Sequence, residues 1–394
     1  MTVFGLTTAG VADPDSEASP QSITIAHWPA GVVPATGSDG HAEVVDTVTG
    51  IVHSFWQLKQ VNGVWRAAMY AWTPLAGRGM GDPAHYYQGA RASGVSTLGG
   101  LIRKQEVNDG DTMYRHALSL SLTFNALAAT PGYSFPVTHT DGNAGTTNYG
   151  KIPMGSLLML PPSFNAQALR TPELRKVAET LKTFGAYVVD RNTGTPFYIY
   201  VETGADFNLN KNGWNTTAAS ELDQLRKALR PLATASSWVD GNGQRVDLAA
   251  PQNLISMRGY WYKYKGTQAG VFDRWQQAVV FPATSTPIEQ TNAGGRAYSG
   301  VTWAQPVVGT AYRVTAIATN GARFRMTIKD KATGALAFDS GDLSDGQSVD
   351  FVWMAPTFTI TTTAKSGVSG VESTVRAELV AVPVVSQTTV QGCV

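Results

Sequence analysis

Acid–base catalysis needs a titratable pair, and four side chains are the candidates for it if this chain is an enzyme: Glu106, His116, His139 and Asp141. None of the four lies in a recognised catalytic motif. His139 and Asp141 share the loop VTHTDGNAGTTNYG, which is polar and glycine-bearing. Loops of this kind on a rigid β-sandwich often meet ligands. Turn chemistry at Asp141-Gly142 explains the same residues equally well.

His116 also has a structural explanation. It is in register with an alternating series of leucines, namely Leu118, Leu120 and Leu122. We therefore expect a histidine at the edge of a buried face, with its ring nitrogens bonded to the backbone.

Flat aromatic rings and planar hydrogen-bonding groups are suited to recognising sugar rings. The irregular segment 73–100 carries several, and a tyrosine-rich run near residue 260 carries others. Two adjacent tyrosines on an irregular loop cannot both readily turn inward, so one of this pair is expected at the surface. The predicted carbohydrate-binding residues are Arg78, His85, Tyr86, Tyr87, Arg91 and Trp261.

The sequence shows no motif for phosphate binding, metal binding or cysteine-based catalysis. The pair Gly99-Gly100 is not followed by the Lys-Ser/Thr of a phosphate-binding loop. A metal site would need histidines and carboxylates from distant loops to converge. The single cysteine, Cys393, is next to last, which rules out an intrachain disulfide and makes it a poor nucleophile. We expect no cofactor and no metal.

Composition narrows the class of protein. The chain has 394 residues, of which 43% are hydrophobic and only 15% charged, with 40 glycines, a balance typical of β-rich extracellular or virion-surface proteins. A net charge of +1 argues against nucleic acid as a partner. No segment approaches the length of a membrane span, and residues 1–22 lack the pattern of a secretory leader. We expect a virion-surface or extracellular location without membrane insertion.

The candidate residues need elements to position them. Alternation predicts an antiparallel strand at 118–124, with a leucine face that is buried and a Ser/Thr face that is wet or lightly covered. Asn62-Gly63 predicts a type I′ hairpin. Helices are predicted near 171–184, with Thr171 as N-cap before Pro172, and near 218–229. Segments 186–190 and 196–202 are predicted to form a β-hairpin.

These elements predict a mainly β protein in which two α-helices interrupt the strands, followed by a C-terminal β-sandwich module. The expected domains are an N-terminal arm or linker at 1–40, the main domain at 41–282, the small sandwich at 288–385 and a flexible tail at 386–394.

A run of short motifs carries a resemblance over about residues 40–202. The motif positions are Gly99, Gly100, Leu101, Ile102, Arg103, Glu106, His116-Ala117-Leu118, Phe135-Pro136, His139, Asp141-Gly142, Ile152-Pro153, Gly155 and Leu160-Pro161. At these positions the chain resembles a family of uncharacterised bacterial and bacteriophage proteins. The resemblance implies that the main domain is a jelly-roll-like antiparallel β-sandwich with two inserted α-helices, and it implies no assigned chemistry.

Two functions follow from these observations. The first is non-enzymatic recognition of host-surface or cell-wall polysaccharide by a phage tail fibre or related virion protein. In that case the N-terminal arm would bind other virion proteins, and the chain would form a homo-oligomer. The alternative is a polysaccharide-degrading enzyme, a lyase or glycoside hydrolase, with a cleft near the glycine-rich loop.

Overall fold

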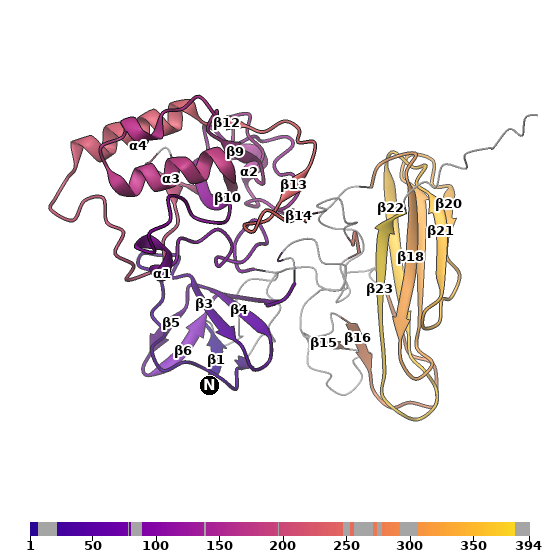
Figure 1. Ribbon diagram of the computed structural model, residues 1–394. Helices are drawn as coiled ribbons and strands as arrows, with labels where there is room; N and C mark the ends of the chain where they lie inside the picture. Colours follow the sequence, from indigo (N-terminus) through magenta and orange to yellow (C-terminus); the bar gives the residue numbers. More distant parts are fainter. Residues whose placement is uncertain are drawn as a thin grey trace, which may run out of the picture. The chain divides into compact units, whose positions relative to one another are not determined.

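The computed structural model describes residues 1–6, 22–77, 79, 89–137, 139–195, 197–246, 253–255, 271–273, 278–291 and 306–382. The fold is mainly β, with several sheets and few helices, which confirms the mainly β part of the predicted class (Figure 1). The main domain is not purely antiparallel as predicted, because two of its strand pairs are parallel. The chain divides into two compact units, whose described residues lie at 1–246 and 253–382.

The N-terminal segment is partly structured, which corrects the predicted arm over residues 1–40. Strand β1 (Thr2–Gly5) pairs antiparallel with β2 (Ser22–Thr24) and parallel with β6 (Val64–Ala67). The physical reason is burial, because Val3 and Ile23 are only 2% and 1% exposed. Two strands near the start of the chain therefore belong to the first unit.

The type I′ hairpin is confirmed. Asn62 and Gly63 have φ values of 52° and 76°, and they join β5 (Lys59–Val61) to β6. The resulting sheet has the order β2-β1-β6-β5. A separate three-stranded antiparallel sheet has the order β3-β4-β7, from strands β3 (Ala42–Asp46), β4 (Ile51–Trp56) and β7 (Met69–Pro74).

A five-stranded mixed sheet follows, with β8 (Leu118–Thr123) between β10 (Ala186–Asn192) and β11 (Phe197–Ile199). β8 is antiparallel to β11 but parallel to β10. The predicted hairpin of segments 186–190 and 196–202 is therefore wrong, because β8 lies between its two arms. The sheet continues through β9 (Leu157–Met159) to β12 (Arg230–Pro231).

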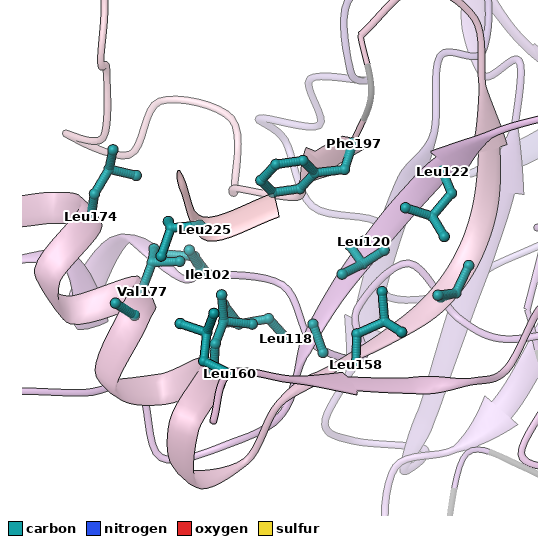
Figure 2. Packing of buried hydrophobic residues seen from close by; sticks show 14 of the residues in the cluster. Ile102, Leu118, Leu120, Leu122, Leu158, Leu160, Leu174, Val177, Phe197 and Leu225 are labelled. Carbon is teal, nitrogen blue, oxygen red and sulfur yellow. The ribbon is translucent and has the colours of Figure 1, made fainter. Parts of the chain in front are cut away.

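Strand β8 is buried on both faces, whereas the sequence predicts one wet or lightly covered face. The leucines pack against residues from the two long helices, including Leu174, Val177 and Leu225 (Figure 2). On the opposite face, Ser119 and Ser121 are 3% and 0% exposed. Their hydroxyls are bonded within the fold, so small polar residues fill a buried position without an unsatisfied group.

Helices α3 (Pro172–Thr183) and α4 (Thr216–Ala228) confirm the two predicted helices and pack against each other. Thr171 is the N-cap of α3, and Gly185 follows the helix with φ of 71°. The remaining elements of the first unit are short: α1 (Lys104–Val107), α2 (Ala144–Thr147), the 3-10 helix η1 (Ala166–Ala168), β13 (Trp238–Val239) and β14 (Arg245–Val246).

The second unit consists of two antiparallel sheets around one core. The first has the order β15-β16-β23-β18-β21, from β15 (Val271–Asp273), β16 (Ala278–Phe281), β18 (Ala311–Ala318), β21 (Ser348–Val352) and β23 (Ser373–Ala381). The second has the order β17-β22-β19-β20, from β17 (Glu289–Thr291), β19 (Arg323–Asp330), β20 (Leu336–Asp339) and β22 (Phe358–Lys365).

Apolar residues from both sheets of this unit form a single cluster, with Trp353 and Phe324 nearly inaccessible to solvent. The unit begins earlier than the predicted boundary at residue 282, because β16 pairs with β23. The apolar strand β16 is therefore part of a sheet of the second unit, and it is not the last strand of the main domain.

Candidate functional site

The first unit contains a cavity of about 580 Å³ beside the glycine-rich loop. Its wall is formed by the loop 95–106, the start of β8, the end of β7 and one face of β10. The side chains that the argument below uses are Arg103, Gln105, Glu106, His116 and Tyr187. The volume falls within the ~300–1,000 Å³ typical of small-molecule sites.

Gly100 allows the loop to lie against β8. Its φ is +73°, and an added Cβ would lie 2.4 Å from Ser119 Oγ and 2.5 Å from the Ser119 amide nitrogen. The Ser119 N–H donates to the Gly100 carbonyl at 3.0 Å, and the Ser119 hydroxyl donates to the Gly99 carbonyl at 2.6 Å. The two glycines therefore give close backbone contact, which a larger residue at position 100 would prevent.

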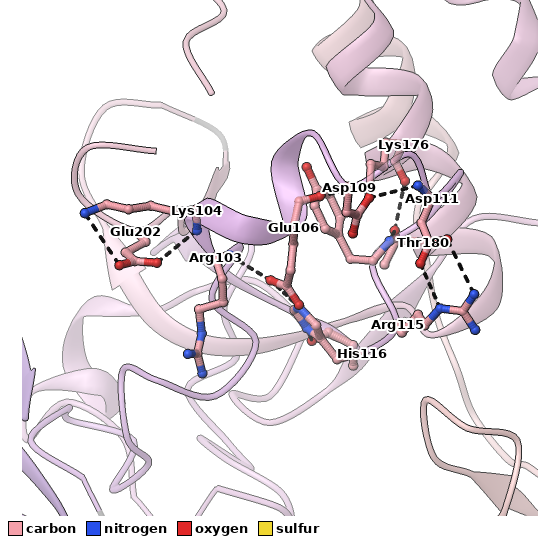
Figure 3. Close-up of polar contacts among 12 residues, drawn as sticks. Arg103, Lys104, Glu106, Asp109, Asp111, Arg115, His116, Lys176, Thr180 and Glu202 are labelled. Atoms are coloured by element: carbon pink, nitrogen blue, oxygen red, sulfur yellow. Dashed lines mark hydrogen bonds and ion pairs between the residues drawn. The ribbon is translucent and has the colours of Figure 1, made fainter. Parts of the chain in front are cut away.

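Glu106 is fixed at the cavity by the short helix α1. Its Oε2 accepts the Arg103 N–H at 2.7 Å. Lys176 of α3 donates from Nζ to the Glu106 carbonyl and to Asp109 Oδ1, both at 2.5 Å (Figure 3). This hydrogen bond lowers the pKa of Asp109. A cation on a long helix thus anchors the segment that presents the Glu106 carboxylate.

His116 is the partner of Glu106. Its Nε2 lies 3.4 Å from both Oε1 and Oε2 of Glu106, and its Nδ1 lies 2.8 Å from the Ala117 carbonyl oxygen. A carbonyl only accepts, so Nδ1 carries a proton. A hydrogen bond between His116 Nε2 and the Glu106 carboxylate therefore requires a second proton, on one of these two groups. The expected backbone bond of His116 is therefore present, and a carboxylate contact accompanies it.

Three polar groups at the cavity remain uncommitted. The guanidinium of Arg103, the amide of Gln105 and the hydroxyl of Tyr187 form no hydrogen bond or ion pair with any residue that the structure describes. Figure 3 shows the Arg103 side chain extending apart from the Glu106–His116 pair. Partial burial raises the pKa of Tyr187, so this hydroxyl stays protonated and can donate.

A buried carboxylate supports the loop from behind. Glu43 Oε1 accepts from the Thr97 hydroxyl and amide at 2.6 and 2.7 Å, from Ser54 Oγ at 2.8 Å and from Ser96 Oγ at 3.0 Å. Its Oε2 is buried without a partner. Burial raises the pKa of Glu43, while the hydrogen bonds from Thr97, Ser54 and Ser96 act in the opposite direction.

His139 and Asp141 do not join Glu106 and His116. The His139 ring is stacked on Tyr133, with centroids 6.5 Å apart, and Asp141 Oδ1 lies 3.2 Å from Arg191. Neither residue lines the cavity. Burial raises the pKa of Asp141, against the lowering effect of Arg191. The four candidate acid–base residues therefore separate into two places, and only the Glu106–His116 pair faces the cavity.

The structure corrects the predicted surface role of Arg91, because this residue is only 2% exposed. Its guanidinium lies 4.2 Å from the centre of the Tyr200 ring, where it packs inside the fold as a cation–π contact. The other predicted carbohydrate-binding residues lie outside the described residues: Arg78, His85, Tyr86, Tyr87 and Trp261.

Sequence reasoning missed Gln105 and Tyr187 as site residues. Gln105 adjoins the glycine-rich motif, whose density of polar residues is a signal that points to it. Tyr187 looks like an ordinary strand residue in AYVVD. Only the parallel pairing of β10 with β8, which places Tyr187 opposite Ser119, brings it to the cavity.

Two searches of the described part of the chain gave no further site. No three or more His, Cys, Asp or Glu side chains are placed there to hold a metal ion. None of the helices described is long and apolar enough to cross a membrane.

The fold and cavity define a mainly β protein with a partly apolar pocket. No protein-family profile and no curated protein matches the chain. One structure found is the glycosylation-associated protein (Gap123) complex from Streptococcus agalactiae, with 11% identity over 30% of this chain and 43% of that one. Another is accessory secretory protein 1, 2 and 3 in Streptococcus pneumoniae, with 10% identity over 34% of this chain and 100% of that one. Both have a TM-score of 0.22, so neither carries an argument about fold or function.

Proposed function

We propose that this chain is a virion-surface or extracellular protein that binds host-surface or cell-wall carbohydrate in the cavity without cleaving it. The supporting observation is the combination, in one 580 Å³ cavity, of an apolar wall with three uncommitted hydrogen-bonding side chains. A phage tail fibre or related structural protein is the form of this proposal that the sequence favours.

The wall suits a sugar ring. Pro74, Leu75 and Leu101 present apolar surface for the C–H face of a ring, while Gln105 and Tyr187 offer donors and acceptors for its hydroxyls. Because these two groups have no partner among the described residues, a ligand does not have to break a hydrogen bond with any of those residues to reach them. The site is therefore ready for a polar ligand with an apolar face.

The lining favours binding over glycoside hydrolysis. Most glycoside hydrolases use two carboxylates that flank the scissile bond. Among the described residues that line the cavity, Glu106 is the only carboxylate, and it is already in contact with His116. A second carboxylate for a displacement mechanism is missing from this set.

Removing one hydroxyl from the cavity should weaken binding. We expect Tyr187→Phe to raise the Kd for a bound oligosaccharide about 3- to 10-fold, the loss of one neutral hydrogen bond. Isothermal titration against oligosaccharides released from bacterial surface polysaccharide measures this change. The matched control is Tyr198→Phe, because Tyr198 is an exposed residue of the same sheet that does not line the cavity. Equal affinities for the two variants would contradict a saccharide site here.

A polysaccharide-degrading enzyme remains the second candidate, and the Glu106–His116 contact favours it. If the pair transfers protons, Glu106→Gln and His116→Ala should each lower the rate of depolymerisation at least about 100-fold. Viscometry and the appearance of new chain ends measure that rate. Glu202→Gln is the control, since Glu202 binds Lys104 outside the cavity lining. Retention of polysaccharide with no shortening by the unmodified protein would exclude this candidate.

The proposal includes assembly. Binding to a repetitive glycan surface gains strength from several linked sites, so a homo-oligomer suits attachment. In this proposal the N-terminal segment contacts other virion proteins. Light scattering of the purified chain tests the oligomeric state. Co-sedimentation of virion proteins with chains that contain or lack residues 7–21 tests the contact without removing strands β1 and β2.

A further inference from the structure

We propose that the saccharide bound in the cavity carries a carboxylate, as a uronic acid does, and that Arg103 pairs with it. This inference rests on the proposed carbohydrate-binding function and specifies its substrate class. It is carried by the distribution of charge over the cavity wall.

The described wall holds two potential cations and one carboxylate, namely Arg103, His116 and Glu106. The Glu106 carboxylate is engaged twice, by His116 Nε2 at 3.4 Å and by the Arg103 backbone N–H at 2.7 Å. His116 is engaged on both nitrogens. The Arg103 guanidinium has no counter-ion among these residues or elsewhere in the described chain. Of these three groups, Arg103 is therefore the one whose charge has no partner among the described residues.

The backbone that carries this charge is well fixed. Ile102, the preceding residue, is fully buried, donates its N–H to the Tyr200 carbonyl at 3.1 Å and accepts from the Glu202 N–H at 2.8 Å. The Arg103 N–H is held by Glu106. A side chain that starts from a fixed backbone loses less freedom when it binds a ligand.

The chemistry of guanidinium selects the ligand group. Its planar fork of N–H donors matches the two oxygens of a carboxylate, and the pair gains geometric specificity from two parallel hydrogen bonds. Arg103 is half-buried, so the interaction is screened less than at an open surface. A neutral sugar would leave this charge without a partner in a partly desolvated cavity.

The test uses paired probes that differ only in charge. Oligogalacturonate, oligomannuronate and hyaluronan oligosaccharides are each titrated beside the neutral oligosaccharide made by reducing their carboxyl groups. We expect at least one acidic member to bind, its neutral counterpart to bind roughly 10- to 100-fold more weakly, and Arg103→Gln to remove the difference. Arg103→Lys keeps the charge but not the fork, and should fall between the two.

Arg245→Gln is the control for lost charge, because Arg245 is exposed and away from the cavity. Far-UV circular dichroism confirms that each variant is folded. If neutral and acidic members bind equally, and Arg103→Gln changes neither, the carboxylate inference is overturned while saccharide binding stands. If no member of either series binds, the proposed function fails with it.

Discussion

Replacing Gly100 with alanine is expected to lower the free energy of unfolding by about 3 kcal/mol or more and to abolish ligand binding. The positive φ costs ~1–2 kcal/mol for a residue with a Cβ. The new Cβ would also lie 2.5 Å from the Ser119 amide nitrogen and 2.8 Å from the Leu118 carbonyl carbon. These are backbone atoms of β8, which cannot move without disturbing its pairing with β10 and β11, and overpacking of this kind adds about 1–3 kcal/mol.

Two other glycines, Gly110 and Gly99, separate the cost of the positive φ from the cost of overpacking against β8. Gly110 also has a positive φ, +85°, but its Cβ would meet nothing within 4 Å, so Gly110→Ala should lose only the conformational part, ~1–2 kcal/mol. Gly99→Ala should be nearly neutral, since its nearest neighbour would be Ser96 O at 3.7 Å. Urea denaturation of the three variants gives the ranking. A Gly100→Ala variant no less stable than Gly110→Ala would show that the close approach to β8 does not matter.

Removal of the Glu43 carboxylate is expected to have a comparable effect. Glu43→Ala would leave the Thr97 amide and three hydroxyls without their acceptor beneath the glycine-rich loop. Each buried unsatisfied group costs about 1–3 kcal/mol, so we expect a loss of at least about 3 kcal/mol in the free energy of unfolding.

Glu43→Gln should reveal the ionisation of this group. Since burial raises the pKa of Glu43 in the folded protein, its protonated form is the better fit there. In the unmodified protein, the contribution of protonated Glu43 to the free energy of unfolding is therefore complete below pH 4.5, the ordinary pKa of a glutamate. That contribution is lost as the pH rises through the raised pKa of the folded state. Glutamine keeps the acceptor and does not ionise, so its advantage over the unmodified protein should grow as pH increases above 4.5.

Denaturation at several pH values between 4 and 8 measures that difference, with the exposed Glu372→Gln as the matched substitution. The other buried acids, such as Asp190, whose pKa burial also raises, contribute equally to both proteins and cancel. A stability difference between Glu43→Gln and the unmodified protein that stays flat with pH would contradict a raised pKa.

Local patterns predicted local structure well. Thr171, Pro172 and Gly185 delimit α3 because capping depends on residues only a few positions apart. The Asn62-Gly63 turn was predictable for the same reason. The five-stranded sheet was not, because nothing in segments 186–202 indicates that a distant strand separates them. The apolar pattern of β1 and β2 was hidden by the polar residues around it.

The residues of the candidate site likewise fall into those that the local sequence indicates and those that only long-range contacts bring to the cavity. Glu106 and His116 are ten positions apart, and their motif pointed to them even though their contact had to be seen. Tyr187 reaches the cavity only through long-range pairing, so no local signal identifies it. Arg91 was misplaced because a sequence shows charge but not the Tyr200 ring that covers it.

The central place of β8 has a consequence for synthesis on the ribosome. Leu118 pairs with Ala186 and Leu122 with Phe197, so β8 emerges long before either neighbour exists. During that interval its leucines and strand edges are unprotected, the condition in which nascent chains rely on chaperones. Tyr187 and Val189 belong to the cavity wall, so a chain interrupted before them has no site. The cavity is thus complete only late in the translation of the first unit.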